Sequence, residues 1–228
     1  RLGELDAEIR RAIDAYDFNA YVRALIDFCN EDLSAFYFDI RKDSLYCDAP
    51  SSLRRRACRT VMAEVFDRLA IWFAPVMVFT CEEAWEQRHP SKPSVHLQQF
   101  PKTPEGWLDA GVAAKWDAVF KVRKAVTEAL EVERREKRIG SSLEATVDVK
   151  IGDAALLKAF DGEDPAEIFI TSGANLVAGG DGIAVTSARA GGVKCARSWK
   201  YFDPATADPA FPDITPRDAV AVREYRGL

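Results

Sequence analysis

Apolar residues in the first part of the chain recur at steps of three and four, a spacing that places them on one face of an α-helix. This spacing predicts helices over about residues 4–16, 17–41, 53–73 and 76–88. Asp17 is a candidate N-cap for the second helix, and Ser51 or Ser52 for the third. Because no part of this region alternates with a period of two, we expect an all-helical bundle over residues 1–112.

The pattern changes after a proline-rich connector over residues 89–111. A single helix is expected over about 113–138, with Gly140 as its C-cap. The following segment, 145–151, alternates apolar and polar residues as a half-buried strand does. Further expected elements are a short helix (153–161), strands (about 167–171, 175–178 and 182–188) and a last helix (216–225). The predicted fold is mainly α: the helical bundle, then a long helix with a small α+β domain (113–190), then a zinc-finger-like tail (191–228).

Composition narrows the class of protein. The 228-residue chain is 48% hydrophobic and has a formal net charge of −5, which fits a soluble protein with a core and excludes a general polyanion binder. Its five cysteines form no CxxC pair, which favours a reducing, cytoplasmic location. No apolar run is long enough to cross a membrane. Only residues 189–228 carry more Lys and Arg than Asp and Glu, so nucleic acid would have to bind to local patches.

Residues with a typical catalytic arrangement are missing from the sequence. His89 and His96 are the only histidines, and neither belongs to a metal or nucleophile motif. Gly179, Gly180 and Gly182 are followed by a strand-like segment and not by a helix, so we interpret them as a hairpin turn and not as a phosphate loop. The bundle is therefore expected to be a binding module without an active site.

Two basic clusters are candidates for phosphate contacts. The first consists of Arg54, Arg55, Arg56 and Arg59. Cations at the start of a helix are unfavourable because they oppose the helix dipole. Bound phosphate would offset this unfavourable interaction, and so would neighbouring acidic side chains. Arg55 and Arg59 share a face of the helix. The second cluster covers residues 131–138, where pairing at i,i+4 is predicted to leave Arg134 and Arg138 free. Most of that run is interpreted as an exposed, ion-paired helix surface.

Four segments, in order, resemble motifs of the isoleucyl-tRNA synthetases. They are DLSAFYFD (32–39) continued by KDSLY (42–46), APVMVFTCEEAW (74–85), SVHLQQFP (94–101) and KRIGSSLEA (137–145). The resemblance covers nearly the whole chain and implies the anticodon-binding, C-terminal part of a bacterial class I enzyme. Valyl and leucyl enzymes share the second motif, whereas the first and last favour isoleucine. Structural roles are the alternative for such residues, with Thr80 as a helix cap and Trp85 in the core.

The resemblance also implies what this portion would do. It would bind the anticodon arm of isoleucine tRNA (tRNA-Ile) and orient it for an upstream catalytic domain of the same chain. The HIGH and KMSKS motifs are missing here, so no catalytic residue is expected, and ATP and magnesium would serve only the full-length ligase. We expect a cytoplasmic monomer that binds no membrane. The alternatives are a freestanding synthetase-like appendage that binds protein or RNA, or the same region of a valyl or leucyl enzyme.

In many members of this family the tail binds zinc through two CxxC pairs. The matching positions here hold Cys195, Ser198, Thr215 and Asp218. One thiolate, one carboxylate and two hydroxyls are a poor set of zinc ligands, so no metal is expected.

The resemblance places Arg197 and Trp199 near the anticodon, with Lys194 and Lys200 beside them. Trp199 would stack on an unpaired base and Arg197 would contact a phosphate or a base edge. The alternative is that Trp199 fills the small core that zinc would otherwise hold together.

Overall fold

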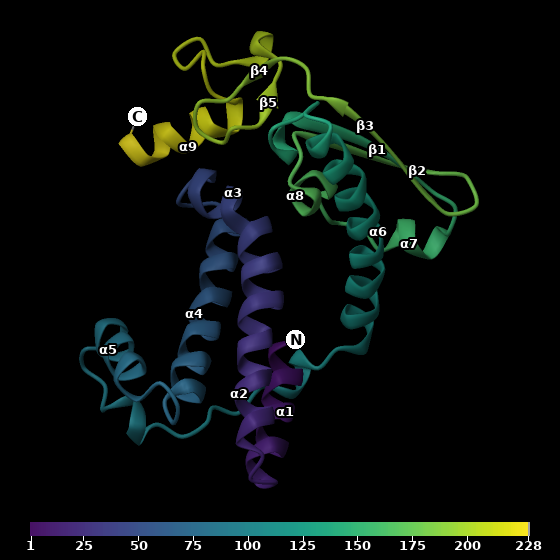
Figure 1. Ribbon diagram of the computed structural model, residues 1–228. Helices are drawn as coiled ribbons and strands as arrows, with labels where there is room; N and C mark the ends of the chain where they lie inside the picture. Colours follow the sequence, from purple (N-terminus) through teal and green to yellow (C-terminus); the bar gives the residue numbers. More distant parts are fainter. Residues whose placement is uncertain (228) are drawn as a thin grey trace. The chain divides into compact units, whose positions relative to one another are not determined.

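The computed structural model describes residues 1–227, which form two compact units (Figure 1). The helical unit comprises Arg1–Asp39 and Arg56–Asp109, and the mixed unit comprises Ile40–Arg55 and the chain from Ala110 onward. Packing thus joins residues 40–55 to the C-terminal half of the chain. The expected boundaries at 112 and 190 stay predictions.

Helices account for the regular structure of the first half, as the apolar spacing predicted. The elements are α1 (Leu2–Asp14), α2 (Phe18–Asp27), the π-helical η1 (Phe28–Phe38), α3 (Asp39–Cys47), α4 (Leu53–Phe73) and α5 (Val78–Arg88). Short 3₁₀ turns follow at Val95–Leu97 and Glu105–Trp107. The side chain of Asp17 accepts a hydrogen bond from the backbone N–H of Ala20, which confirms it as an N-cap.

Two details of these helices differ from the prediction. The helix expected to end near Arg41 continues through η1 and α3 to Cys47. Thr80 is not a helix cap, because α5 already begins at Val78 and its N-cap position is Met77. In both cases only the helix boundary is wrong, and boundaries depend on a few local contacts that apolar spacing does not report.

The core of the helical unit is apolar. Leu5, Ile9, Leu25 and Trp72 are buried together, and the hydroxyl of Tyr21 donates a hydrogen bond to the backbone carbonyl of Trp72. Burial raises the pKa of Tyr21 to about 12. A second cluster contains Trp85, whose indole N–H donates to the carbonyl of Pro93 at 3.0 Å. Trp85 is therefore a core residue, as expected.

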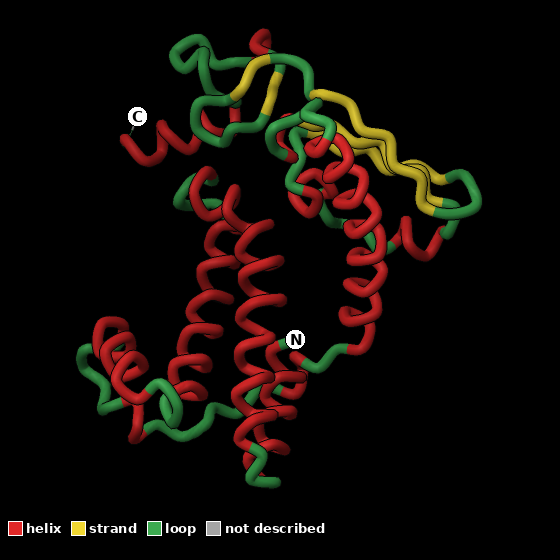
Figure 2. Tube along the Cα trace, in the orientation of Figure 1, coloured by secondary structure: helices red, strands yellow, loops and turns green. Residues whose placement is uncertain are grey.

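A small sheet defines the α+β part of the mixed unit. Its elements are α6 (Ala110–Arg135), β1 (Ala145–Ile151), α7 (Ala154–Lys158), α8 (Pro165–Phe169), β2 (Gly173–Ala178) and β3 (Ile183–Arg189). The strand order is β2-β1-β3, with β1 parallel to β2 and antiparallel to β3. Helix α6 packs on this sheet through Val119, Val122, Val126 and Leu130, which share one core with β1 (Figure 2).

Three predictions for this part are wrong. Residues 167–171 were expected to form a strand but fall largely in α8, because Asp164 caps a helix that Pro165 begins, and this signal outweighs β-branched composition. Gly179–Gly182 do not form a hairpin turn, since β2 and β3 lie on opposite sides of β1. Gly140 is not a C-cap, because α6 ends at Arg135 and the left-handed residue is Lys137.

The tail forms its own small cluster within the mixed unit. It contains the strands β4 (Val193–Lys194) and β5 (Tyr201–Phe202), a 3₁₀ turn (Pro204–Thr206) and the helix α9 (Pro216–Arg226). Cys195, Ile214 and Ala219 are buried together at its centre. None of the helices within residues 1–227 is long and apolar enough to cross a membrane.

Candidate nucleic-acid interface

The centre of the tail is a buried carboxylate, that of Asp218. Thr215 caps α9 by accepting a hydrogen bond from the backbone N–H of Asp218, which places Asp218 in the first helical turn. The hydroxyls of Thr215 and Ser198 each donate to Asp218 Oδ2 at 2.7 Å, and Cys195 Sγ lies 3.2 Å from the same oxygen. We call these four residues the Asp218 cluster. Cys195 and Asp218 are both fully buried.

These are the four positions that the motif resemblance matches to zinc ligands. They converge in space, but the carboxylate of Asp218 occupies the centre and the other three groups are hydrogen-bonded to it. Two neutral hydroxyls with one thiol and one carboxylate do not match the four N or S donors of a structural zinc site. The residues present therefore do not fit zinc, and the expectation of a zinc-free tail stays a prediction. Within residues 1–227, no group of three or more His, Cys, Asp or Glu side chains is placed to hold a metal.

Two arginines balance the charge of Asp218. Arg197 Nη1 lies 2.7 Å and Arg217 Nη2 lies 3.4 Å from Asp218 Oδ1. Burial raises the pKa of Asp218, but hydrogen bonds from Thr215 and Ser198 and the charge of Arg217 outweigh it, so the pKa falls below its ordinary value. The carboxylate is thus held ionised in the interior of the tail.

The same arginines attach the tail to the 40–55 segment. Arg197 Nη2 donates to the carbonyl of Tyr46 at 2.8 Å, and its Nη1 donates to the carbonyl of Cys47. Arg217 Nη2 donates to Asp43 Oδ1 at 2.9 Å. Burial raises the pKa of Asp43, but the hydrogen bond from Arg217 and the charge of Lys200 lower it overall.

A further group of ion pairs joins this segment to α8. Arg54 Nη2 lies 2.7 Å from Asp48 Oδ1, and Arg54 Nη1 lies 3.2 Å from Glu167 Oε2. Glu167 is buried and also accepts from Arg41 at 3.0 Å. Arg54 is therefore bound to acidic side chains, and its charge offsets theirs. The first basic cluster was expected to contact either phosphate or acidic side chains, and for Arg54 the structure shows acidic side chains.

Trp199 does not fill the core of the tail. Its side chain is 61% exposed, and Lys194 Nζ lies 5.2 Å from the centre of its ring. Its φ of 64° is in the left-handed region, which non-glycine residues seldom adopt and which is common at functional sites. The turn from Cys195, closed by the N–H of Trp199 donating to the Cys195 carbonyl at 3.1 Å, holds the indole at the surface.

The other predicted site residues are dispersed. Lys200 Nζ lies 3.4 Å from Asp43 Oδ2, so it serves the attachment of the tail. Arg55 Nη1 donates to the carbonyl of Asp48 at 3.0 Å, and Arg59 is exposed and belongs to the helical unit. The expected pair on one face of a helix is thus divided between the two units.

The prediction that Arg134 and Arg138 are free is wrong. Arg134 pairs with Glu131, and Arg138 Nη2 donates to Glu133 Oε1 at 2.8 Å. The chain leaves its helix at Arg135, so the i,i+4 geometry that would pair Glu133 with Lys137 does not form.

The sequence did not reveal the acidic anchors of the tail. Asp43, Asp48 and Glu167 lie in different elements, and their partners are up to 174 positions away along the chain. The one usable signal was Thr215 three positions before Asp218, the spacing of a capping box.

Comparison with known proteins identifies the class. Residues 1–151 match the family model described as the anticodon-binding domain of tRNA ligase. This match covers more than half of the chain, and the chain belongs to this family.

A more particular likeness is to isoleucine–tRNA ligases, as the motifs indicated. The whole chain aligns with the isoleucine–tRNA ligases of three bacteria. The identity is 54% over 240 residues for Agrobacterium fabrum, 51% over 239 for Brucella abortus (biovar 1) and 48% over 239 for Bartonella henselae. In each case it covers 25% of the relative. The chain therefore spans about a quarter of the length of the curated relatives it matches.

Proposed function

We propose that this chain is the tRNA-binding portion of an isoleucine–tRNA ligase and recognises the anticodon arm of tRNA-Ile. The observation that carries the proposal is the exposed indole of Trp199, held by a left-handed turn with Lys194 over its ring. An exposed aromatic face beside a cation suits an unpaired base and its phosphate. Family membership makes tRNA the partner.

The ion pairs behind Trp199 support this role. Arg197 is fixed by Asp218 and by the carbonyls of Tyr46 and Cys47, so the turn that carries Trp199 is held from beneath. A surface that is already ordered loses less entropy when it binds. The Asp218 cluster would thus serve as the structural centre that zinc supplies in other members of the family.

In the full-length ligase, ATP and magnesium would act in a catalytic region that this chain does not contain. The contribution of this chain is to hold tRNA-Ile in register with that region. We expect the protein to act as a cytoplasmic monomer.

The test is binding of tRNA-Ile and of a non-cognate tRNA to the purified chain across a series of salt concentrations. Trp199→Ala should weaken binding of tRNA-Ile by roughly 5- to 150-fold, because base stacking contributes roughly 1–3 kcal/mol. The unfolding midpoint should stay unchanged, since the indole is mostly exposed.

Phe79→Ala is the matched control, since Phe79 is also exposed and lies in the helical unit. It should leave RNA binding unaltered. Equal affinity of the wild-type chain for both tRNAs, or unaltered binding by Trp199→Ala, would contradict the proposal. A partner protein bound in place of RNA would favour the freestanding interaction module instead.

A further inference from the structure

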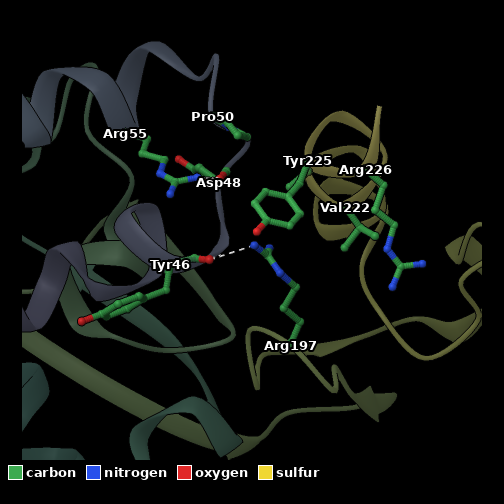
Figure 3. Close-up of a pocket in the computed structure, with 9 residues that line it drawn as sticks. Tyr46, Asp48, Pro50, Arg55, Arg197, Val222, Tyr225 and Arg226 are labelled. Carbon is green, nitrogen blue, oxygen red and sulfur yellow. Dashed lines mark hydrogen bonds between the residues drawn. The ribbon is translucent and has the colours of Figure 1, made fainter. Parts of the chain in front are cut away.

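A cavity of about 360 Å³ lies between the 40–55 segment and α9, both within the mixed unit (Figure 3). Arg55, Arg197 and Arg226 line it from three separate segments, and Tyr225 lies at its edge. In Figure 3 the guanidinium of Arg226 is directed away from those of Arg55 and Arg197. Trp199 does not line it. It is thus separate from the Trp199 site, and Tyr225 was not singled out from the sequence.

Positive charge dominates this cavity. Among the described residues, Asp48 is the only acidic one that lines it, and Arg54 already binds both oxygens of that carboxylate, at 2.7 and 2.8 Å. Arg55 donates from Nη1 to the backbone carbonyl of Asp48. The remaining N–H groups of Arg55 are therefore donors for an anion.

The remaining walls are aromatic and apolar. The ring of Tyr225 is 83% exposed, and Figure 3 shows its hydroxyl end directed toward the guanidinium of Arg197. Val222, one turn earlier on α9, supplies an apolar surface beside it. The ring of Tyr46 points away from the cavity, so its contribution is the backbone carbonyl that holds Arg197.

The volume of the cavity and the chemistry of its lining residues together indicate the class of ligand. Pockets for small ligands enclose roughly 300–1,000 Å³, so this cavity suits a group at the lower end of that range. Guanidiniums bind phosphate through paired N–H donors, and a phenol ring presents a face on which any base can stack. A single nucleotide carries both groups within that volume.

We propose that this cavity binds one unpaired nucleotide of RNA, with its base against Tyr225 and its phosphate at Arg55. The inference rests on the proposed function and deepens it, because it adds a nucleotide subsite apart from Trp199. Arg197 forms a wall of the subsite while its carboxylate partner is Asp218. The ion pairs around Asp218 thereby also shape the subsite.

The experiment compares Tyr225→Ala, Tyr225→Phe and Arg55→Gln in the full chain for binding to the anticodon stem-loop of tRNA-Ile. Tyr225→Ala should weaken binding by roughly 5- to 150-fold and Tyr225→Phe should retain it, because stacking needs the ring and not the hydroxyl. Arg55→Gln should weaken binding and lower the slope of log affinity against log salt by about one, because it removes the charge and keeps a side-chain donor for the carbonyl of Asp48.

Two control variants separate these effects from general ones. Val220→Ala removes an exposed side chain of α9 outside the cavity, and Arg135→Ala removes an exposed cation of α6; both should bind as the wild type does. All variants should have the wild-type unfolding midpoint. A stem-loop in which one loop nucleotide is abasic should bind the wild type and Tyr225→Ala equally well, which identifies the nucleotide that is held.

The outcomes distinguish the two proposals. If the wild-type chain fails to prefer tRNA-Ile, the proposed function fails. If Trp199→Ala weakens binding while Tyr225→Ala and Arg55→Gln bind like the wild type, only the nucleotide subsite is overturned.

Discussion

The two units of this chain are stabilised by different forces. The helical unit buries apolar side chains such as Leu25 and Trp72, and its buried polar contacts are few. The mixed unit has an apolar core under its sheet, but its tail and its 40–55 segment are joined by buried or half-buried ion pairs centred on Asp43, Asp48 and Asp218.

This difference teaches how a small element can be stabilised by polar contacts. The buried apolar cluster of the tail consists of Cys195, Ile214 and Ala219, too small a cluster to hold it by hydrophobic burial alone. The side chains of Cys195, Ser198 and Thr215 converge on the carboxylate of Asp218, which accepts hydrogen bonds from them. Arginines then offset the buried negative charge.

The largest effect is expected from restoring a metal site. A variant with Ser198→Cys, Thr215→Cys and Asp218→Cys, together with Cys195, should bind one zinc ion through four thiolates. Structural zinc contributes roughly 10–16 kcal/mol of apparent binding energy in zinc-finger peptides, so chelation should unfold the tail of this variant. Metal binding is measured by titration. Cobalt serves as the probe because its thiolate complex absorbs light, and zinc is titrated in the same way. The corresponding triple alanine variant should bind no metal, and a four-cysteine variant that also binds none would mean that these positions do not converge.

A smaller effect is expected from breaking one contact in each unit. Asp218→Ala should destabilise the tail by about 3–5 kcal/mol, because it leaves Arg197 without its buried partner. Trp72→Ala should cost the helical unit about 3–5 kcal/mol, through lost burial and the cavity left behind. Hydrogen exchange resolved along the chain should assign each loss to its own unit. The exposed pair of Glu131 with Arg134 is the control, and Glu131→Ala should change stability by less than about 1 kcal/mol.

The smallest effect is a difference in pH response. The pKa values of Asp43 and Asp218 are lowered in the folded state, so their stabilisation is present above the ordinary carboxyl pKa of about 4 and is lost as pH falls below it. The pKa of Tyr21 is raised to about 12, so its contribution is present below about 10 and is lost as pH rises toward 12. Unfolding followed by hydrogen exchange should begin in the mixed unit in acid and in the helical unit in alkali. Asp218→Asn should reduce the acid sensitivity, and an unchanged acid profile in that variant would exclude Asp218 as its source.

Particular elements show how far the sequence could be read. The helix over 53–73 and the strand over 145–151 were predicted with the bounds of α4 and β1, because each has a long, regular apolar period. The element at 167–171 was assigned to the wrong class, since a short apolar run carries little periodicity and the Asp164–Pro165 start signal was not used.

Only part of the candidate site could be predicted from the sequence. Arg197 and Trp199 were predicted because the motif resemblance placed them, whereas Tyr225 belongs to no motif and comes together with Arg55 only through folding. Arg134 and Arg138 were assigned from helical spacing, which no longer applies beyond the end of α6.

The sequence by itself determined the helical and strand periods, the order of the family motifs and the loss of a proper zinc ligand set, because these depend on residue type and short spacing. Only the tertiary structure decided which cations are paired, that Cys195, Ser198 and Thr215 are hydrogen-bonded to Asp218, and that residues 40–55 pack with the tail. The physical reason is distance. An ion pair forms between groups a few ångströms apart in space, and its partners here are separated by as many as 174 positions in the chain.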